Sequence, residues 1–106
     1  MFYINGIQWN IVFVNNSSDK LRRSNGSITV GMADWNDKCV YMSNKLHGTY
    51  LRRVLAHELC HCFVFSYGVV MNIKEEERLA NWISLYGTEL VYLLDDLMQN
   101  FKRNVV

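Results

Sequence analysis

His57-Glu58-Leu59-Cys60-His61 is the stretch from which the fold of this chain is inferred. Residues four apart on an α-helix lie on one face, so a helix here would direct both histidines at one metal ion. Glu58 lies on the adjoining part of that face, where its carboxylate can take a proton from water at the metal. The spacing therefore predicts a helix that carries two metal ligands and a general base.

The residues around this motif have the spacing of two successive helices. Thr49 is the predicted N-cap of the helix that carries the histidines, and Gly68 is its predicted end. A second, long helix is predicted from Ile73 onward, because apolar residues recur at helical spacing there. Asn72 and Glu75 have the spacing of a capping box at its start.

The residues before the motif are typical of β-strands. Strands are predicted over 7–14, 27–35 and 39–43, and Asn36-Asp37 is the predicted turn of a hairpin between the last two. Strands followed by helices predict an α+β fold. We expect a short N-terminal antiparallel sheet of about three strands, packed on the motif helix and on a long C-terminal helix.

Length and composition favour a small globular protein and disfavour several functions. The 106 residues predict one domain over 1–106, and half of them are hydrophobic. The net charge is +1 and no basic run interleaved with aromatics occurs, so we expect no direct nucleic-acid partner. No apolar run predicts a membrane span. Three cysteines and an N-terminus unlike a signal peptide predict a reducing cytoplasm, the host cell cytosol.

A third metal ligand is expected from the glutamate run Glu75-Glu76-Glu77. Catalytic zinc has three protein ligands and an open position. Two helices joined by a short connection pack side by side, so an early residue of the second helix can face the histidines. Glu77 is the preferred ligand because it shares a helix face with Asn81, and Glu76 is the alternative. Asn81 is predicted to hydrogen-bond the outer nitrogen of a liganding histidine.

Simpler explanations of the same residues exist. Two histidines four apart can be ordinary core or surface residues, and acidic residues favour the start of a helix anyway. His47 is read as a loop or cap residue. The combination of Glu58 between the histidines with carboxylates just downstream favours metal binding over coincidence.

On these residues the chain resembles the gluzincin metallopeptidases, in particular the ImmA/IrrE-like family of phages and mobile elements. The matching pieces are His57-Glu58-Leu59-Cys60-His61 and Glu77-Arg78-Leu79-Ala80-Asn81. The strand that ends in Val40-Tyr41-Met42-Ser43 is similar to the strand before the family's active-site helix. In outline the resemblance covers residues 28 to 86.

The resemblance implies a zincin-like domain in which His57, His61 and Glu77 bind Zn²⁺ and Glu58 is the general base. It also implies a protein substrate, because relatives on mobile elements cleave repressor proteins. An edge strand of such a sheet can bind an extended peptide as an added strand. The expected function is therefore a zinc metallopeptidase of a phage or mobile element that cleaves a specific protein.

Two other functions stay open. One is a non-catalytic zinc-containing binding protein, such as a phage-encoded, anti-CRISPR-like inhibitor of a host defence enzyme. The intact Glu58 argues against this function. The lack of an obvious further histidine to stabilise an oxyanion favours it. The remaining candidates for stabilising an oxyanion are Tyr41, Tyr67 and Tyr86. The other is a metal-free interaction domain.

Overall fold

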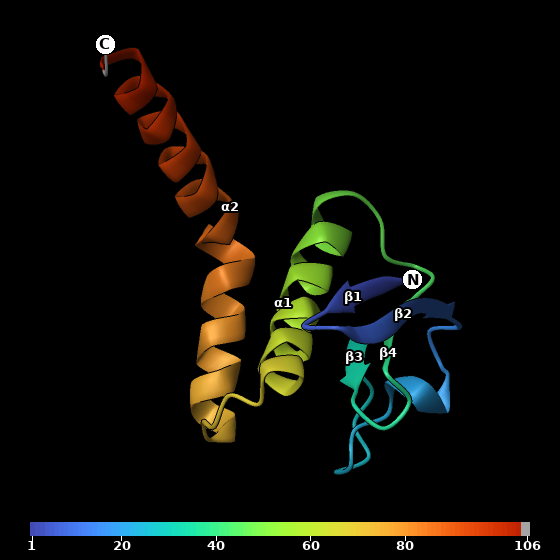
Figure 1. Ribbon diagram of the computed structural model, residues 1–106. Coiled ribbons are helices and arrows are strands. Elements are labelled where there is room, and N and C mark those ends of the chain that lie inside the picture. The colour runs from blue at the N-terminus through green and yellow to red at the C-terminus, as the bar shows by residue number, and fades with distance from the viewer. Residues whose placement is uncertain (105–106) are drawn as a thin grey trace.

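A sheet at the N-terminus and two helices make up the protein, and a computed structural model describes residues 1–104 of it (Figure 1). The elements in order are β1 (Phe2–Ile4), β2 (Ile7–Val14), the short 3-10 helix η1 (Asp19–Leu21), β3 (Gly31–Asp34), β4 (Cys39–Ser43), α1 (Gly48–Tyr67) and α2 (Ile73–Asn104). The predicted α+β class, with the sheet first and a long C-terminal helix, is confirmed.

The sheet has four strands in the order β1-β2-β4-β3, one more than expected. The additional strand is β1, which forms a hairpin with β2 through Asn5-Gly6. Both turn residues have positive φ, 50° and 78°, as a two-residue hairpin turn requires. The predicted hairpin between β3 and β4 is confirmed.

The expectation of a wholly antiparallel sheet is wrong. The sheet is mixed, because β2 and β4 pair in parallel. After β2 the chain crosses over through η1 and β3, and β4 then returns between β2 and β3. The strand predicted from residue 27 begins only at Gly31. The preceding loop is held instead by a bridge between Arg22 and Ile28 and by a hydrogen bond from Thr29 N–H to the Leu21 carbonyl, 2.8 Å.

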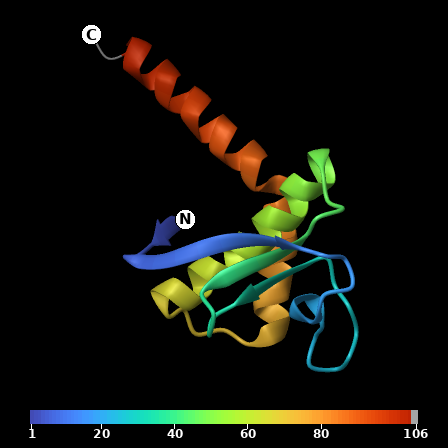
Figure 2. The same cartoon turned by 90° about the vertical axis from the view of Figure 1, so that its right-hand side faces the viewer.

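The protein has three layers, with α1 between the sheet and α2 (Figures 1 and 2). The core between α1 and the sheet includes Trp9, Val40, Met42 and Cys62, all fully buried. The Trp9 indole N–H donates to the Ser66 hydroxyl at 2.9 Å, which ties the first hairpin to the last turn of α1. Burial of these apolar groups is the main force that orients α1 on the sheet.

Two of the three helix ends predicted from the sequence are confirmed. Gly68 ends α1 in the left-handed conformation, φ 62°, as predicted. The Glu75 N–H donates to the Asn72 side-chain oxygen at 2.8 Å, so the predicted cap of α2 is confirmed. The predicted N-cap Thr49 is wrong, because α1 already begins at Gly48 with His47 as N-cap residue and no side-chain cap bond.

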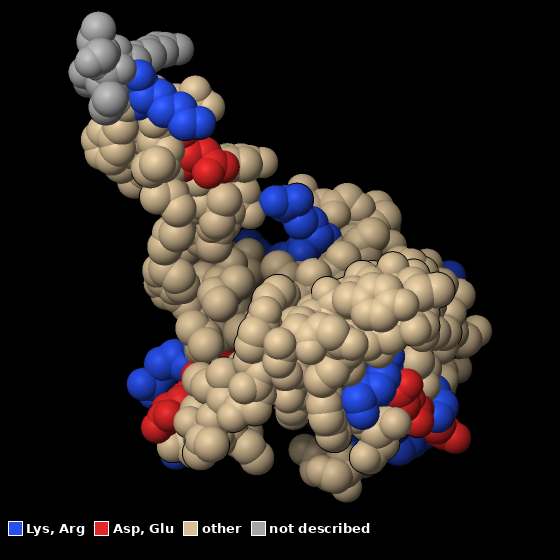
Figure 3. All heavy atoms as spheres, in the orientation of Figure 1, with Lys and Arg blue, Asp and Glu red and all other residues tan. Residues whose placement is uncertain are grey.

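The second part of α2, residues 89–104, projects away from the rest of the protein and is called the projecting part (Figures 1 and 2). The radius of gyration is 16.3 Å, whereas a compact domain of this length has about 13 Å. Figure 3 shows basic and acidic side chains on the projecting part, among uncharged ones. No helix among the described residues is long and apolar enough to cross a membrane.

Candidate metal centre

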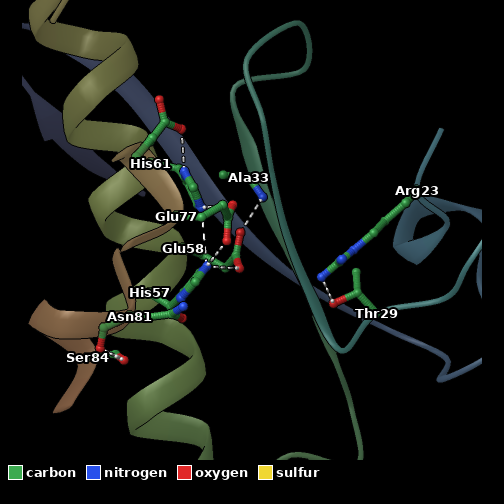
Figure 4. Close-up of polar contacts among 10 residues, drawn as sticks. Arg23, Thr29, Ala33, His57, Glu58, His61, Glu77, Asn81 and Ser84 are labelled. Atoms are coloured by element: carbon green, nitrogen blue, oxygen red, sulfur yellow. Dashed lines mark hydrogen bonds and ion pairs between the residues drawn. The ribbon is translucent and has the colours of Figure 1, made fainter. Parts of the chain in front are cut away.

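Helix α1 places His57 and His61 one turn apart with their rings facing the same point (Figure 4). Their Nε2 atoms are 3.3 Å apart. The side chain of His57 is 20% exposed and that of His61 is 11% exposed. The two nitrogens thus lie in a mostly desolvated site that remains open on one side.

Glu77 reaches the same point from the first turns of α2. Its Oε2 is 3.2 Å from His57 Nε2 and its Oε1 is 3.0 Å from His61 Nε2. His57, His61 and Glu77, here called the ligand cluster, each offer one ligand atom, and these atoms lie within 4.8 Å of one another. Of the two glutamates considered as third ligand, Glu77 is the one that the fold brings to both histidines.

The spacing of the ligand cluster fits a tetrahedral metal ion. Zinc binds nitrogen and oxygen at 2.0–2.1 Å, which places neighbouring corners of a tetrahedron about 3.3 Å apart. The two histidine nitrogens are 3.3 Å apart, and each lies 3.0 to 3.2 Å from a different oxygen of the Glu77 carboxylate. The two imidazoles and one carboxylate would supply three ligands to such an ion, the number found in catalytic zinc sites, which keep one position open.

Glu76, the alternative third ligand, contacts His61 from the other side. Its Oε2 faces His61 Nδ1, the ring nitrogen directed away from the ligand cluster. A carboxylate there accepts the Nδ1 proton and leaves the lone pair of Nε2 for a metal. Glu76 therefore has the orienting function that was predicted for Asn81.

Asn81 lies beside His57 in Figure 4, but no described hydrogen bond joins its side chain to either histidine. Asn81 is exposed, and its backbone carbonyl accepts a hydrogen bond from the Ser84 hydroxyl, 2.7 Å. The predicted orienting bond from Asn81 is thus not formed. Helical phase placed Asn81 on the correct face, but it could not show which ring nitrogen lies within reach.

Glu58 points at the ligand cluster from the side of the sheet. Its Oε2 is 4.0 Å from His57 Nε2, and its Oε1 accepts the backbone N–H of Ala33 in β3 at 3.0 Å. Burial raises the pKa of Glu58, while the two histidines and the Ala33 N–H oppose that rise. A carboxylate held beside the metal position, without coordinating it, has the placement of a general base.

Gly31 lets β3 approach α1 closely at Glu58. A Cβ atom on Gly31 would lie 2.8 Å from Val54 Cγ1 and 3.2 Å from Glu58 Cγ. Only a residue without a side chain fits at that distance. The sequence shows this glycine inside a predicted strand, where an isolated glycine indicates close backbone approach, but not which residue it approaches.

Two hollows adjoin the ligand cluster. The main cleft, about 650 Å³, follows β3 and includes Arg23, Ala33, Glu58 and all three cluster residues. The side pocket, about 190 Å³, is lined in part by Arg23, Arg53, His57 and Glu58. None of the tyrosines considered as oxyanion donors (Tyr41, Tyr67, Tyr86) lines either hollow.

Several residues of this site were missed by the sequence analysis, namely Arg23, Ala33 and Arg53. A backbone N–H leaves no trace in the residue type, and the arginines occur in pairs that look like solvated charge.

Comparisons with protein-family models, with curated proteins and with solved structures found no match for this chain.

Proposed function

We propose that this protein is a zinc-dependent metallopeptidase that cleaves a specific protein, as its resemblance to the ImmA/IrrE-like gluzincins implies. One observation carries the proposal: Glu58 lies 4.0 Å from the His57 ligand nitrogen and is held there by the Ala33 N–H. A purely structural metal site has no need of a fourth side chain, a carboxylate that does not coordinate, beside its three ligands.

The donor set suits zinc. Two neutral imidazoles and one carboxylate form a catalytic type of site, whereas magnesium and calcium prefer oxygen ligands alone. Bound zinc supplies Lewis acidity, which polarises a carbonyl and acidifies water. His57, His61 and Glu77 would hold it, and Glu76 would keep His61 in the tautomer that has a free Nε2 lone pair.

Glu58 would move the proton during peptide hydrolysis. In this mechanism its carboxylate accepts a proton from the attacking water and then donates it to the leaving amine. The hydrogen bond from Ala33 keeps Oε1 in place and leaves Oε2 directed at the ligand cluster. Water adds across the peptide bond, so the carboxylate is regenerated at the end of the cycle.

Strand β3 would position the substrate. It is the last strand of the sheet order, so one of its edges has no neighbouring strand. An extended peptide can pair through backbone hydrogen bonds with the groups of this edge that remain free, since the Ala33 N–H is already bonded to Glu58. The main cleft runs between this edge and the ligand cluster, which supports a polypeptide substrate over a small molecule.

The resemblance also supports a setting for this activity. Relatives on phages and mobile elements cleave repressor proteins, so a repressor or a host defence protein is the proposed target. All three cysteines are free, which agrees with the reducing cytosol of a host cell.

The decisive experiment compares the zinc-loaded wild-type protein with Glu58→Gln. We expect the variant to retain one zinc per chain and to lose cleavage of the target, because the amide cannot accept the proton. Glu89→Gln removes a carboxylate from α2 outside the site and serves as the matched control. Unchanged cleavage by Glu58→Gln would exclude Glu58 from the mechanism.

The second candidate is a non-catalytic zinc-containing binding protein, such as an anti-CRISPR-like inhibitor of a host defence enzyme. The projecting part of α2 favours it, because large apolar side chains such as Leu93 and Phe101 stay more than half exposed there. Inhibition of a target by Glu58→Gln as strong as by wild type, with no cleavage by either, would establish this function.

A further inference from the structure

We propose that the side pocket binds an acidic side chain of the substrate, an aspartate or glutamate close to the scissile bond. The part of this proposal that places the acidic residue close to a scissile bond rests on the proposed peptidase function. The binding of a carboxylate in the pocket is a separate claim, which can be tested without turnover.

Two arginines from separate parts of the chain meet at this pocket. Arg23 comes from the loop between η1 and β3, and Arg53 comes from α1, one turn before His57. Figure 4 shows the Arg23 side chain extended, with its guanidinium end beside Thr29. Two arginines that line one small polar hollow can together bind an anion through their guanidinium groups.

Neither arginine is neutralised within the protein. Among the described side chains no carboxylate forms an ion pair with Arg23 or Arg53, and Arg23 makes only a long contact to the Thr29 hydroxyl, 3.5 Å. The neighbouring arginines differ, because Arg22 pairs with Asp19 and Arg52 donates to the Thr88 hydroxyl at 2.9 Å. The charges at the pocket are thus available to a ligand.

The rest of the pocket suits one side chain. Its volume of about 190 Å³ lies below the range of roughly 300–1,000 Å³ of pockets for whole small molecules. Thr29, Asn81 and Ser84 add polar groups to the wall. Glu58 also lines the pocket and is the one carboxylate among its lining residues, so the ligand carboxylate would have to bind the arginines without contacting Glu58.

The position of the pocket links it to the reaction. Four residues line both the side pocket and the main cleft, namely Arg23, Gly31, His57 and Glu58. A peptide paired with β3 in the main cleft would direct a side chain near the scissile bond into the side pocket. The pocket therefore favours acidic over neutral residues at that position.

The test uses the zinc-loaded, full-length Glu58→Gln protein and two blocked peptides, acetyl-Ala-Glu-Ala-amide and acetyl-Ala-Gln-Ala-amide. We expect the glutamate peptide to bind about three- to tenfold more tightly in a calorimetric or NMR titration, the size of a partly exposed ion pair. Arg23→Gln and Arg53→Gln should each reduce this ratio, and the double variant should abolish it. Arg52→Gln, which alters the adjacent residue of α1 outside this pocket, should leave the ratio unchanged.

The outcomes separate the pocket from the peptidase function. Equal binding of the two peptides, or an equal loss of preference in Arg52→Gln, would overturn the pocket as an acidic subsite. A preference for the glutamate peptide without cleavage of any protein by the wild type would uphold the pocket and overturn the peptidase. Cleavage of a protein by the wild type, without a preference for acidic residues, would uphold the peptidase and overturn the pocket as an acidic subsite.

Discussion

The two halves of α2 differ in what they contact, although they form one continuous helix. The inner half, residues 73–88, packs on α1: Ala80 is fully buried, and Glu76 and Glu77 contact the histidines. The outer half, residues 89–104, is the more apolar, yet Leu93 and Phe101 are 57% and 56% exposed. Apolar composition alone therefore does not decide which half is packed.

The difference follows from helix length. Helix α1 has 20 residues and α2 has 32, and the two run antiparallel from a short connection. The hydrogen bond between Arg52 and Thr88 lies near the start of α1, so the turns of α2 beyond it have no neighbour in the described structure. Each half has three carboxylates, so the comparison shows that the ligand cluster forms in the half that packs on α1, and that the number of carboxylates does not decide its place.

The largest effect is expected on zinc affinity, when a carboxylate of the inner half and one of the outer half are removed in turn. Glu77→Ala should lower zinc affinity by more than about 100-fold, because even the outer partner of a liganding histidine is worth roughly 10- to 100-fold. Glu89→Ala, on the outer half, should leave the affinity unchanged. Competition with a chromophoric chelator measures both, and equal losses would show that Glu77 is not a ligand.

Adding zinc should stabilise only the inner half. At a free zinc concentration of about 100 times Kd, the bound state gains roughly 2.7 kcal/mol. Backbone amides of α1 and of residues 73–88 should then exchange up to about 100-fold more slowly, wherever exchange requires the ligand cluster to open. Amides of the outer half should exchange at the same rate with zinc or with a chelator. Slowing in both halves would contradict the comparison.

A smaller effect is expected from Glu76→Ala. Removing the acceptor at His61 Nδ1 should weaken zinc binding by about 10- to 100-fold without abolishing it. Glu75→Ala removes the neighbouring carboxylate, which contacts the Asn72 cap, and should leave zinc affinity unchanged. A loss in Glu76→Ala as large as in Glu77→Ala would mean that Glu76 coordinates the metal directly.

The smallest effect is expected on the outer half. Leu93→Ala should change the free energy of unfolding by less than about 0.5 kcal/mol, because the side chain contacts little outside its own helix. Leu21→Ala, at a fully buried position, should cost about 2–5 kcal/mol. Urea denaturation of both variants gives the comparison, and a large loss in Leu93→Ala would reveal packing of the outer half.

Much of the site could be predicted because its geometry is local. The separation of His57 and His61 by one turn follows from helix geometry alone, and the short connection limits the third ligand to the glutamate run. The choice between Glu76 and Glu77 depends on how α2 is rotated against α1, which side-chain packing sets. Sequence spacing could rank Glu77 above Glu76 as the third ligand. It could not show that Glu76 contacts Nδ1 of His61 while Glu77 contacts Nε2.

The fold could be predicted by class but not by strand pairing. The hairpin of β1 and β2 was missed although Asn5-Gly6 is a strong signal for a two-residue turn. The parallel pairing of β2 with β4 had no local signal, because it depends on where the crossover through η1 and β3 leaves the chain. The arginine-lined pocket depends on the same crossover, since Arg23 lies within it.

The ligand cluster lies entirely within one helical hairpin, from His57 to Glu77. Contacts this close in sequence form with little loss of loop entropy and early in folding. The ion could therefore bind before the sheet has assembled, and it would then hold α1 and α2 together while the slower, long-range strand pairing proceeds. Glu58 is held by Ala33 of the sheet, so it would reach its final position only once β3 has docked on α1, and a chain without a complete sheet would hold metal before the proposed general base is in place.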